Sequence, residues 1–460
     1  MNDGRAASGT PWRAVAPWLG LVFGIAAGPA GAAARARDGG TLRLALLPEV
    51  RADRAGETPE GAVVHGLLAS PLCRVEASGR LTPLLATFQR TAEGLSLVPR
   101  PGARFGAGAP LGTPELARAL ARAMELSPVA RAALAPVRDA AATLAQLGRT
   151  QGAVLTLPLA YPWPDLEVAL CHPALTPWRG DGQGGGIGLY VGDGPERGKA
   201  SPDFPEGRPH PDALVLSTLS RRAAQRALEG RGAQALLGEG GDPSAQALFA
   251  TYLVARSGSQ PLLGLLDSRL DRAALVRSFV GGPAAPLPGL LPPALGGPDG
   301  AGPRTAPARG SGTALLLYVA DRRAQRAVAE RLQILLADAG VQLTLSARTA
   351  EALERDWGAG QGDLALRSVL LPPLPAPALA VVLELTGDTA AQRRELAALG
   401  AVPDAAERAT RARERALQLA GTLPVLPLHV EGLRARLDPS LIDVRRDALG
   451  LLVLDDAWWP

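Results

Sequence analysis

The feature that most constrains the fold is a strand–helix–strand pattern between residues 314 and 345. Residues 314–319 form a continuous apolar run, residues 324–339 have helical spacing up to Gly340, and residues 341–345 alternate cleanly. Glycine at the end of a helix suits the left-handed conformation that stops it. Because a helix between two strands usually joins a parallel pair by a right-handed crossover, the chain is predicted to be mixed α/β.

Shorter segments repeat this mixture along the chain. Strands are predicted at residues 41–47, 95–98 and 213–216, and helices at 61–68, from Thr113 onward, and from the third strand through Leu228. Thr113 is expected to cap its helix, with Pro114 at the first helical position. Residues 180–207 are predicted to be mostly loop, and residues 283–307 are either an extended crossing segment or disordered. At 460 residues the chain exceeds one core, so two or three domains are expected.

The N-terminal segment is typical of an export signal. Arg5 and Arg13 precede the apolar run 14–27, and small residues follow from 28 to 36. We therefore predict a signal peptide over residues 1–36 and a periplasmic location, the alternative being a membrane anchor that is retained. No cysteine ends the apolar run, so a lipid-anchored form is not expected.

Charge and composition exclude several partners and cofactors. The formal net charge is +4, but the arginines are interspersed with acidic residues, so nucleic acid is not a predicted partner. The four histidines and two cysteines lack metal-ligand spacing, so no metal and no cofactor are predicted. Cys73 and Cys171 either form a disulfide or remain two buried free thiols, and the sequence leaves both possibilities open.

Sequence motifs of catalysis are missing. The chain contains no Gly-x-Ser-x-Gly nucleophile elbow, no His-Glu-x-x-His zinc motif and no phosphate-binding Gly-x-x-x-x-Gly-Lys loop. Asp455 and Asp456 are adjacent, so in a strand they would point to opposite faces and would not form a catalytic pair. An enzymatic function is therefore not expected.

A series of short blocks follows a fixed order between residues 83 and 122. Its members are Pro83-Leu-Leu-Ala86, Glu93-Gly94, Arg100, Gly102, Phe105 to Pro110, Thr113-Pro-Glu-Leu116 and Arg122.

Further blocks continue this order to the end of the chain. They are Gly186 to Tyr190, Gly207-Arg-Pro209, Leu270-Asp-Arg272, Leu291-Pro-Pro293, Ala329 to Gln333, Gly340-Val341, Gly362 to Leu366 and Leu423 to Leu428. The series resembles the extracellular solute-binding proteins of the oligopeptide, dipeptide and nickel type, which form substrate-binding family 5 of the ABC transporters.

The resemblance implies a two-lobed, periplasmic-binding-protein-like fold with a hinge. We expect one lobe over residues 37–264, with a satellite subdomain at about 50–158, and a second lobe over 265–424. Residues 425–460 are expected to return to the first lobe. The implied function is capture of a short peptide or other small solute by a monomer that delivers it to an ABC permease. The alternative is a family member that no longer transports and serves as an envelope structural or interaction protein.

The expected ligand contacts lie just past strand ends that face the cleft between the lobes. Glu49 and Arg51 follow the first strand, Arg367 and Ser368 follow the strand 363–366, and Trp163 is expected to supply an aromatic wall. The family's longer stretch between residues 366 and 423 is short here, and no aspartate matches the one that receives a peptide's amino terminus. Peptide specificity of the usual kind is therefore not carried over to this chain.

Overall fold

The computed structural model describes residues 38–50, 58–105, 108–150, 152–178, 185–192, 196–241, 247–298 and 310–460. The expected signal peptide lies outside these residues, as do Arg51 and part of the segment 283–307. The described part of the latter contains the short strand β12 (Ala284–Pro286) and a 3-10 turn at Pro293–Leu295.

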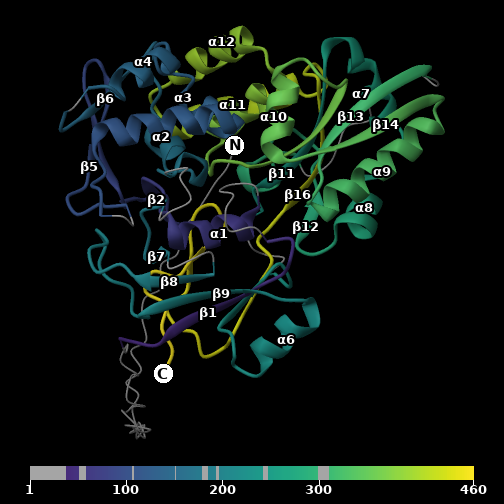
Figure 1. Cartoon of the computed structure of the whole chain (residues 1–460). Coiled ribbons are helices and arrows are strands. Elements are labelled where there is room, and N and C mark those ends of the chain that lie inside the picture. The colour runs from purple at the N-terminus through teal and green to yellow at the C-terminus, as the bar shows by residue number, and fades with distance from the viewer. Residues whose placement is uncertain are drawn as a thin grey trace, which may run out of the picture. The chain divides into compact units, whose positions relative to one another are not determined.

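Two six-stranded sheets organise the chain (Figure 1). The first sheet is centred on β1, which pairs in parallel with both β9 and β10, while its other pairs are antiparallel. Its order is β17 (Ala435–Leu437), β10 (Ala235–Leu237), β1 (Thr41–Leu46), β9 (Ala213–Thr218), β8 (Arg197–Ala200) and β7 (Tyr190–Gly192).

The second sheet contains the strand–helix–strand unit that was predicted between residues 314 and 345. Strand β13 pairs in parallel with β14 along its whole length, and α9 (Arg323–Ala337) connects the two, as predicted. Gly340 follows with φ +90°, in the left-handed region that favours glycine. The sheet order is β12, β16 (Val425–Glu431), β11 (Phe249–Ala255), β15 (Leu364–Leu370), β13 (Gly312–Val319) and β14 (Val341–Arg348).

The sheet pairings run across the expected lobe boundaries. Strand β11 lies before residue 264 and β16 lies after residue 424, yet β11 pairs with both β15 and β16 inside the second sheet. The chain therefore crosses from the first sheet to the second between β10 and β11, and returns between β16 and β17. The sheet that a strand joins is decided by its distant hydrogen-bonding partners, which local periodicity does not reveal, and the lobe boundaries at 264 and 424 remain a prediction.

Both faces of the second sheet are buried at its inner strands β11, β15 and β16. On one face α7 (Gln260–Asp267) and α9 cover Leu253, Leu316 and Leu364, and the turns α8 (Arg272–Leu275) and Val276–Val280 lie beside α9. Neighbouring side chains such as Leu317 and Ala365 point into the largest core cluster on the other face. This double burial explains why these strands are nearly continuous apolar runs.

A satellite region precedes the rest of the first sheet in sequence. It contains two small antiparallel sheets, a helical layer of α2, α3 and α4, and the short α5. Its elements are β2 (Cys73–Val75), β3 (Leu81–Pro83), β4 (Ala86–Arg90), β5 (Gly94–Pro99), α2 (Thr113–Leu126), α3 (Pro128–Leu134), α4 (Ala140–Leu147), β6 (Leu155–Pro158) and α5 (Leu166–Leu170). Thr113 does not cap α2 as predicted: Gly112 is the capping residue, and the Thr113 hydroxyl donates to the carbonyl of Gly152 at 2.8 Å.

Helices inserted between β15 and β16 pack against this satellite region. Helix α11 (Pro375–Thr386) packs on α3 (Figure 1), and it also contacts α12 (Thr389–Gly400) and α13 (Ala405–Leu419). The remaining helices are α1 (Pro59–Leu68), α6 (Arg221–Glu229) and α10 (Ala350–Gly358), and a last hairpin joins β18 (Arg445–Arg446) to β19 (Leu452–Val453).

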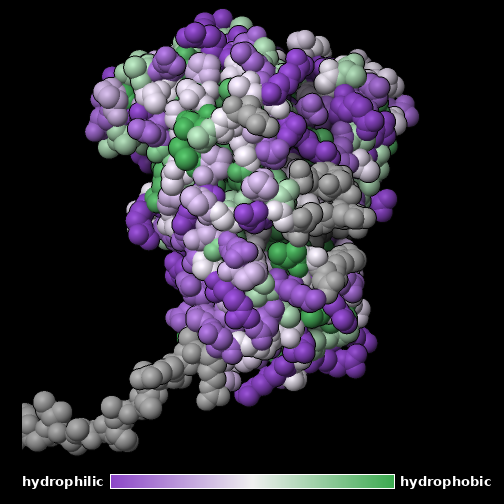
Figure 2. Space-filling model, turned by 60° about the vertical axis from the view of Figure 1, so that its left-hand side comes forward, coloured by the Kyte–Doolittle hydropathy of each residue, from purple (hydrophilic) through white to green (hydrophobic). Residues whose placement is uncertain are grey.

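Most of the face drawn in Figure 2 is hydrophilic, and its hydrophobic residues form small separate patches. Among the described residues, every helix is too short or too polar to span a bilayer.

Candidate ligand-binding site

Two adjoining cavities lie between elements of the first sheet's side and elements of the second sheet. The crossover cavity, of about 280 Å³, is lined by the end of β1, the start of α1, the turn 276–281, the start of α9 and the return segment 431–434. The α2–α10 cavity, of about 260 Å³, is lined by α2, α10 and the end of β15. Arg322 and Ser368 line both cavities, so the two are neighbours along one continuous cleft wall.

Helix α1 brings Glu60 to the crossover cavity. The Thr58 hydroxyl caps the helix by accepting from the Gly61 N–H at 3.0 Å, which places Glu60 in the first turn. The Glu60 carboxyl is only 7% exposed and accepts the backbone N–H of Arg434 at 2.7 Å. Burial raises the pKa of Glu60 to about 7, because its charged form loses water that this one N–H only partly replaces.

Glu431 faces the same cavity from the end of β16. It contacts the side chain of Arg434 and lies 3.2 Å from Nε2 of His429. Burial disfavours the charged form of Glu431, but the hydrogen bond with His429 and the charge of Arg434 outweigh it and hold the pKa below its usual value. One side of the crossover cavity thus presents an ionised carboxylate beside a carboxyl group that exchanges its proton near neutral pH.

The α2–α10 cavity is lined by a buried chain of ion pairs. Arg367 contacts Glu354, whose other oxygen lies 2.9 Å from a guanidinium nitrogen of Arg131. Arg131 also donates to Glu384 on α11 at 2.6 Å. Although Glu354 is buried, the two arginines keep its pKa low, so this carboxylate remains charged and engaged with them.

Between the cavities, a hydrogen-bonded group fixes the shared wall. Ser368 lies 2.8 Å from the Thr251 hydroxyl and accepts from the Gln325 amide at 2.7 Å. The amide oxygen of Gln325 accepts the N–H of Val319 at 2.9 Å, which ties the start of α9 to the end of β13. The guanidinium of Arg322 lies 5.3 Å from the centre of the Phe249 ring, a cation–π distance.

Three of the five residues predicted to contact the ligand line these cavities. Glu49 lines the crossover cavity, Arg367 lines the α2–α10 cavity, and Ser368 lines both. Arg51 lies outside the described residues. Trp163, the expected aromatic wall, is 1% exposed and lines neither cavity; it packs against Gly400 of α12 as part of the core.

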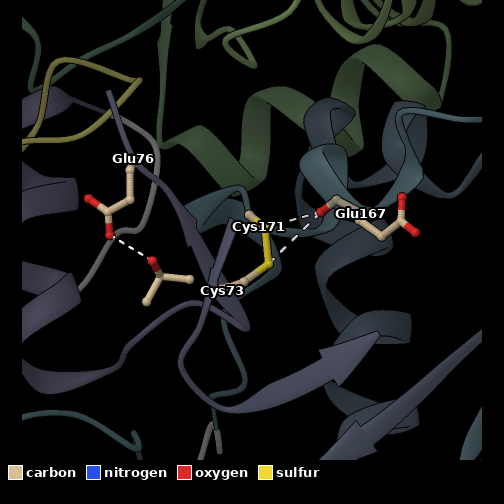
Figure 3. The surroundings of a disulfide bond; sticks show 5 residues. Cys73, Glu76, Glu167 and Cys171 are labelled. Carbon is tan, nitrogen blue, oxygen red and sulfur yellow. Dashed lines mark hydrogen bonds between the residues drawn. A yellow bond between two sulfur atoms is a disulfide. The ribbon is translucent and has the colours of Figure 1, made fainter. Parts of the chain in front are cut away.

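Cys73 and Cys171 form a disulfide, the first of the two possibilities that the sequence left open (Figure 3). The bond joins β2 to the C-terminal end of α5, with the Cα atoms 4.6 Å apart. Both sulfur atoms lie near the backbone carbonyl oxygen of Glu167, at 3.1 and 3.9 Å. The bond closes a loop of about a hundred residues, and neither cysteine lines either of the two cavities.

Several lining residues were missed from the sequence. Asp321 and Arg322 follow the strand 314–319, and Glu431 ends β16, so the strand-end argument that selected Glu49 would also have selected them. The aromatic wall of the α2–α10 cavity comes from Trp178, whose ring meets His65 edge-on with centroids 5.2 Å apart.

A nearby glycine pair explains how Trp178 reaches this wall. Trp178 forms a β-bridge with Gly186, and a Cβ atom at Gly186 would lie 2.4 Å from the carbonyl oxygen of Leu68 at the end of α1. Gly188 approaches the same turn equally closely. The Gly-Ile-Gly block therefore lets this segment lie directly against α1.

The described residues contain no cluster of His, Cys, Asp and Glu arranged to hold a metal ion. No protein-family model matches the chain. No curated protein matches it either.

Solved structures do match, over nearly the whole chain. The murein tripeptide binding protein MppA of Escherichia coli has a TM-score of 0.66 at 15% identity, covering 92% of this chain and 98% of its own. AgaA from A. tumefaciens R10, a PBP solved with agropinic acid, has a TM-score of 0.67 at 14% identity, covering 92% and 99%. NikA from Staphylococcus aureus, solved with Ni(L-His)2, has a TM-score of 0.65 at 12% identity, covering 91% and 100%.

These neighbours are binding proteins rather than enzymes, and they share one architecture across different ligands. At this identity the likeness shows the fold and leaves the ligand to the residues of this chain. The protein therefore has the two-lobed, periplasmic-binding-protein-like fold of the ABC substrate-binding proteins of family 5, the oligopeptide, dipeptide and nickel type.

Proposed function

We propose that the protein captures a short peptide or other small solute outside the cytoplasmic membrane and delivers it to an ABC permease. The observation that carries this proposal is the pair of adjoining cavities whose walls come from both sides of the two crossovers. In a two-lobed binding protein, the ligand lies in such a place and hinge closure encloses it.

The chemistry of the cavities supports a small polar solute. Arginines, carboxyl groups, hydroxyls and an amide converge on a space of about 280 Å³ in one cavity and about 260 Å³ in the other. A few well-placed polar groups in a concave site fix a ligand's orientation and give specificity. Trp178, Phe249 and Phe279 add apolar surface for the body of the solute.

We propose that the lobes divide at the crossovers. In this division the segment 249–431 forms the second lobe, and the satellite region belongs to the first. The residues before Thr41 would direct export to the periplasm, and the protein would act as a monomer.

A thermal-shift screen of the mature protein tests the proposal. Its pools are di- to tetrapeptides, amino acids, sugars and nickel salts, each at a concentration well above micromolar. A ligand at 100 times its dissociation constant stabilises by about 2.7 kcal/mol, which raises the Tm of a chain of this length by about 3 °C.

A reproducible shift with one pool identifies the solute class. The matched control is Arg367→Ala combined with Ser368→Ala, which removes cavity-wall groups and should abolish that shift. Folded protein that responds to none of the pools would contradict the transport proposal and would favour an envelope structural or interaction protein.

A further inference from the structure

The two cavities differ in their balance of charge. Among the described lining residues, the α2–α10 cavity has three arginines against two glutamates, and one of those glutamates, Glu354, also neutralises Arg131 outside the cavity. Arg122, at the same wall, forms no ion pair within the described residues. This cavity therefore attracts an anionic group.

The crossover cavity has as many carboxyl groups as arginines. Two of its arginines are already matched: Arg434 by Glu431, and Arg221 by Glu239 at 3.3 Å. Glu49 makes no ion pair with any residue that the structure describes, and Glu60 is bound to a backbone N–H instead of to a cation. Relative to its neighbour, this cavity favours a positive group.

Several charged groups surround Glu60. On the return segment, the Arg434 N–H donates to it and the Arg434 charge favours ionisation, while Glu431 on β16 opposes it. The other charged residues that line the cavity are Glu49 after β1, Arg221 on α6, Arg277 on the turn 276–280, and Asp321 and Arg322 before α9. In this setting Glu60 holds its proton up to about pH 7.

We propose that the cationic amino group of a bound solute lies in the crossover cavity against Glu60, and that its binding releases the Glu60 proton to solvent. The solute's carboxylate then lies toward Arg122 and Arg367 in the α2–α10 cavity. The proposal rests on the proposed solute-binding function and adds an orientation and a proton to it. The one covalent bond that breaks is the O–H bond of the Glu60 carboxyl: the carboxylate keeps the electron pair and pairs with the ammonium, and the proton passes to water or buffer.

The geometry gives a physical reason for this coupling. Glu60 bridges α1, on the first sheet's side, to the return segment that links β16 to β17. An ammonium group arriving here replaces the lost hydration of the Glu60 carboxylate with a direct partner, so the ionised form becomes the stable one. Ligand affinity must then rise with pH as long as free Glu60 is protonated.

The test uses di- to tetrapeptides with free amino termini and the same peptides N-acetylated. Affinity is measured between pH 5.5 and 7, because an α-amino group itself titrates at about 7.7–8.0. If binding lowers the pKa of Glu60 by about two units, the tightest unblocked peptide should bind about tenfold more tightly at pH 7 than at pH 5.5. Calorimetry in two buffers of different ionisation enthalpy should report nearly one proton released per peptide at pH 6.

Two variants complete the test. Glu60→Gln should bind with little pH dependence and no proton release, whereas Glu414→Gln, exposed on α13 and lining neither cavity, should keep both. The proton count on the unmodified protein needs no variant, so a misfolded Glu60→Gln protein would not decide the matter.

The remaining outcomes separate this inference from the proposed function. Equal binding of acetylated and free peptides, or an unchanged pH dependence in Glu60→Gln, overturns the inference while solute binding stands. Binding of a neutral sugar pool with no proton release has the same meaning. Failure of every pool at every pH overturns both.

Discussion

Two contacts between the parts of this protein are built on opposite electrostatic principles. Where α5 of the satellite region meets α13, the Arg408 guanidinium forms two bonds to the Asp165 carboxylate, at 2.9 and 2.5 Å. Arg408 is 3% exposed and also donates to the carbonyl of Val402 at 2.7 Å, so every charge there has a permanent partner. At the crossover cavity, by contrast, Glu60 is similarly buried, and its carboxyl is hydrogen-bonded to backbone N–H groups and not to a cationic side chain.

We call the Asp165–Arg408 contact the fixed contact, because its charges are paired, and the surroundings of Glu60 the adjustable contact, because the Glu60 charge can change. At the fixed contact, a Cβ atom at Gly400 would lie 1.9 Å from the carbonyl oxygen of Pro162, so the helix and the satellite loop touch with no spare room. The crossover cavity, by contrast, has an open volume of about 280 Å³. Its wall contains the Glu60 carboxyl group, whose charge depends on pH. We infer that the first contact holds the structure together and that the second is where it responds.

Removing the disulfide should have the largest effect on the fixed contact between α5 and α13. The bond anchors the C-terminal end of α5, and Asp165 lies at its N-terminal end. Replacing Cys73 and Cys171 together by alanine should lower the free energy of unfolding by about 4–5 kcal/mol, since the bond closes a loop of about a hundred residues. Urea unfolding of the oxidised protein and the double variant measures this loss. A loss below about 1 kcal/mol would mean that α5 is held by its other contacts alone.

Arg408→Ala should lower the free energy of unfolding by nearly as much as loss of the disulfide. It leaves the Asp165 carboxylate buried without its cation, which typically costs about 3–5 kcal/mol. The matched control is Arg411→Ala on the same helix, whose partner Glu407 is exposed and whose loss should cost less than about 1 kcal/mol. Equal unfolding free energies for the two variants would remove the distinction between the fixed contact and an ordinary surface pair.

The adjustable side is tested by the stability of Glu60→Gln against pH. The pKa of Glu60 is raised from 4.5 to about 7, so the folded state keeps a proton that the unfolded state loses. Stability from this group is therefore highest below pH 4.5, falls as pH rises to about 7, and is constant above. The glutamine variant avoids this fall, and its stability relative to the unmodified protein should increase by up to about 3 kcal/mol between pH 4 and pH 8.

Denaturant unfolding at the two pH values measures that change. Burial also raises the pKa of Asp447 to about 7, but Asp447 is present in both proteins and cancels in the difference. Glu351→Gln, on the exposed surface of α10, should leave stability nearly unchanged at either pH. A flat difference between Glu60→Gln and the unmodified protein would mean that Glu60 is ionised in the folded state at all these pH values.

The candidate site was predictable where local sequence carries the information. Glu49 follows a buried strand and lines a cavity wall, as a polar residue at the edge of a sheet can. Arg367 and Ser368 also line cavity walls, although they lie inside β15 and not past its end. Trp163 lines neither cavity, because Pro-Trp-Pro in a loop has the same local appearance whether the ring faces a cleft or, as here, a helix 237 residues further along the chain (400 − 163). Glu60 gave no signal, since an acidic residue in the first turn of a helix is ordinary.

The sequence by itself determined the classes of structure: the parallel strand–helix–strand unit, the buried strands, the helix that ends at Gly340 and the order of blocks that resembles the binding-protein family. These follow from periodicity and backbone preference, which act over a few residues. The tertiary structure decided which sheet β11 and β16 join, that Cys73 meets Cys171, and that Glu60 is buried beside Arg434. Each of these depends on contacts between segments far apart in the chain, where burial and pairing energies are set by neighbours that no local pattern specifies.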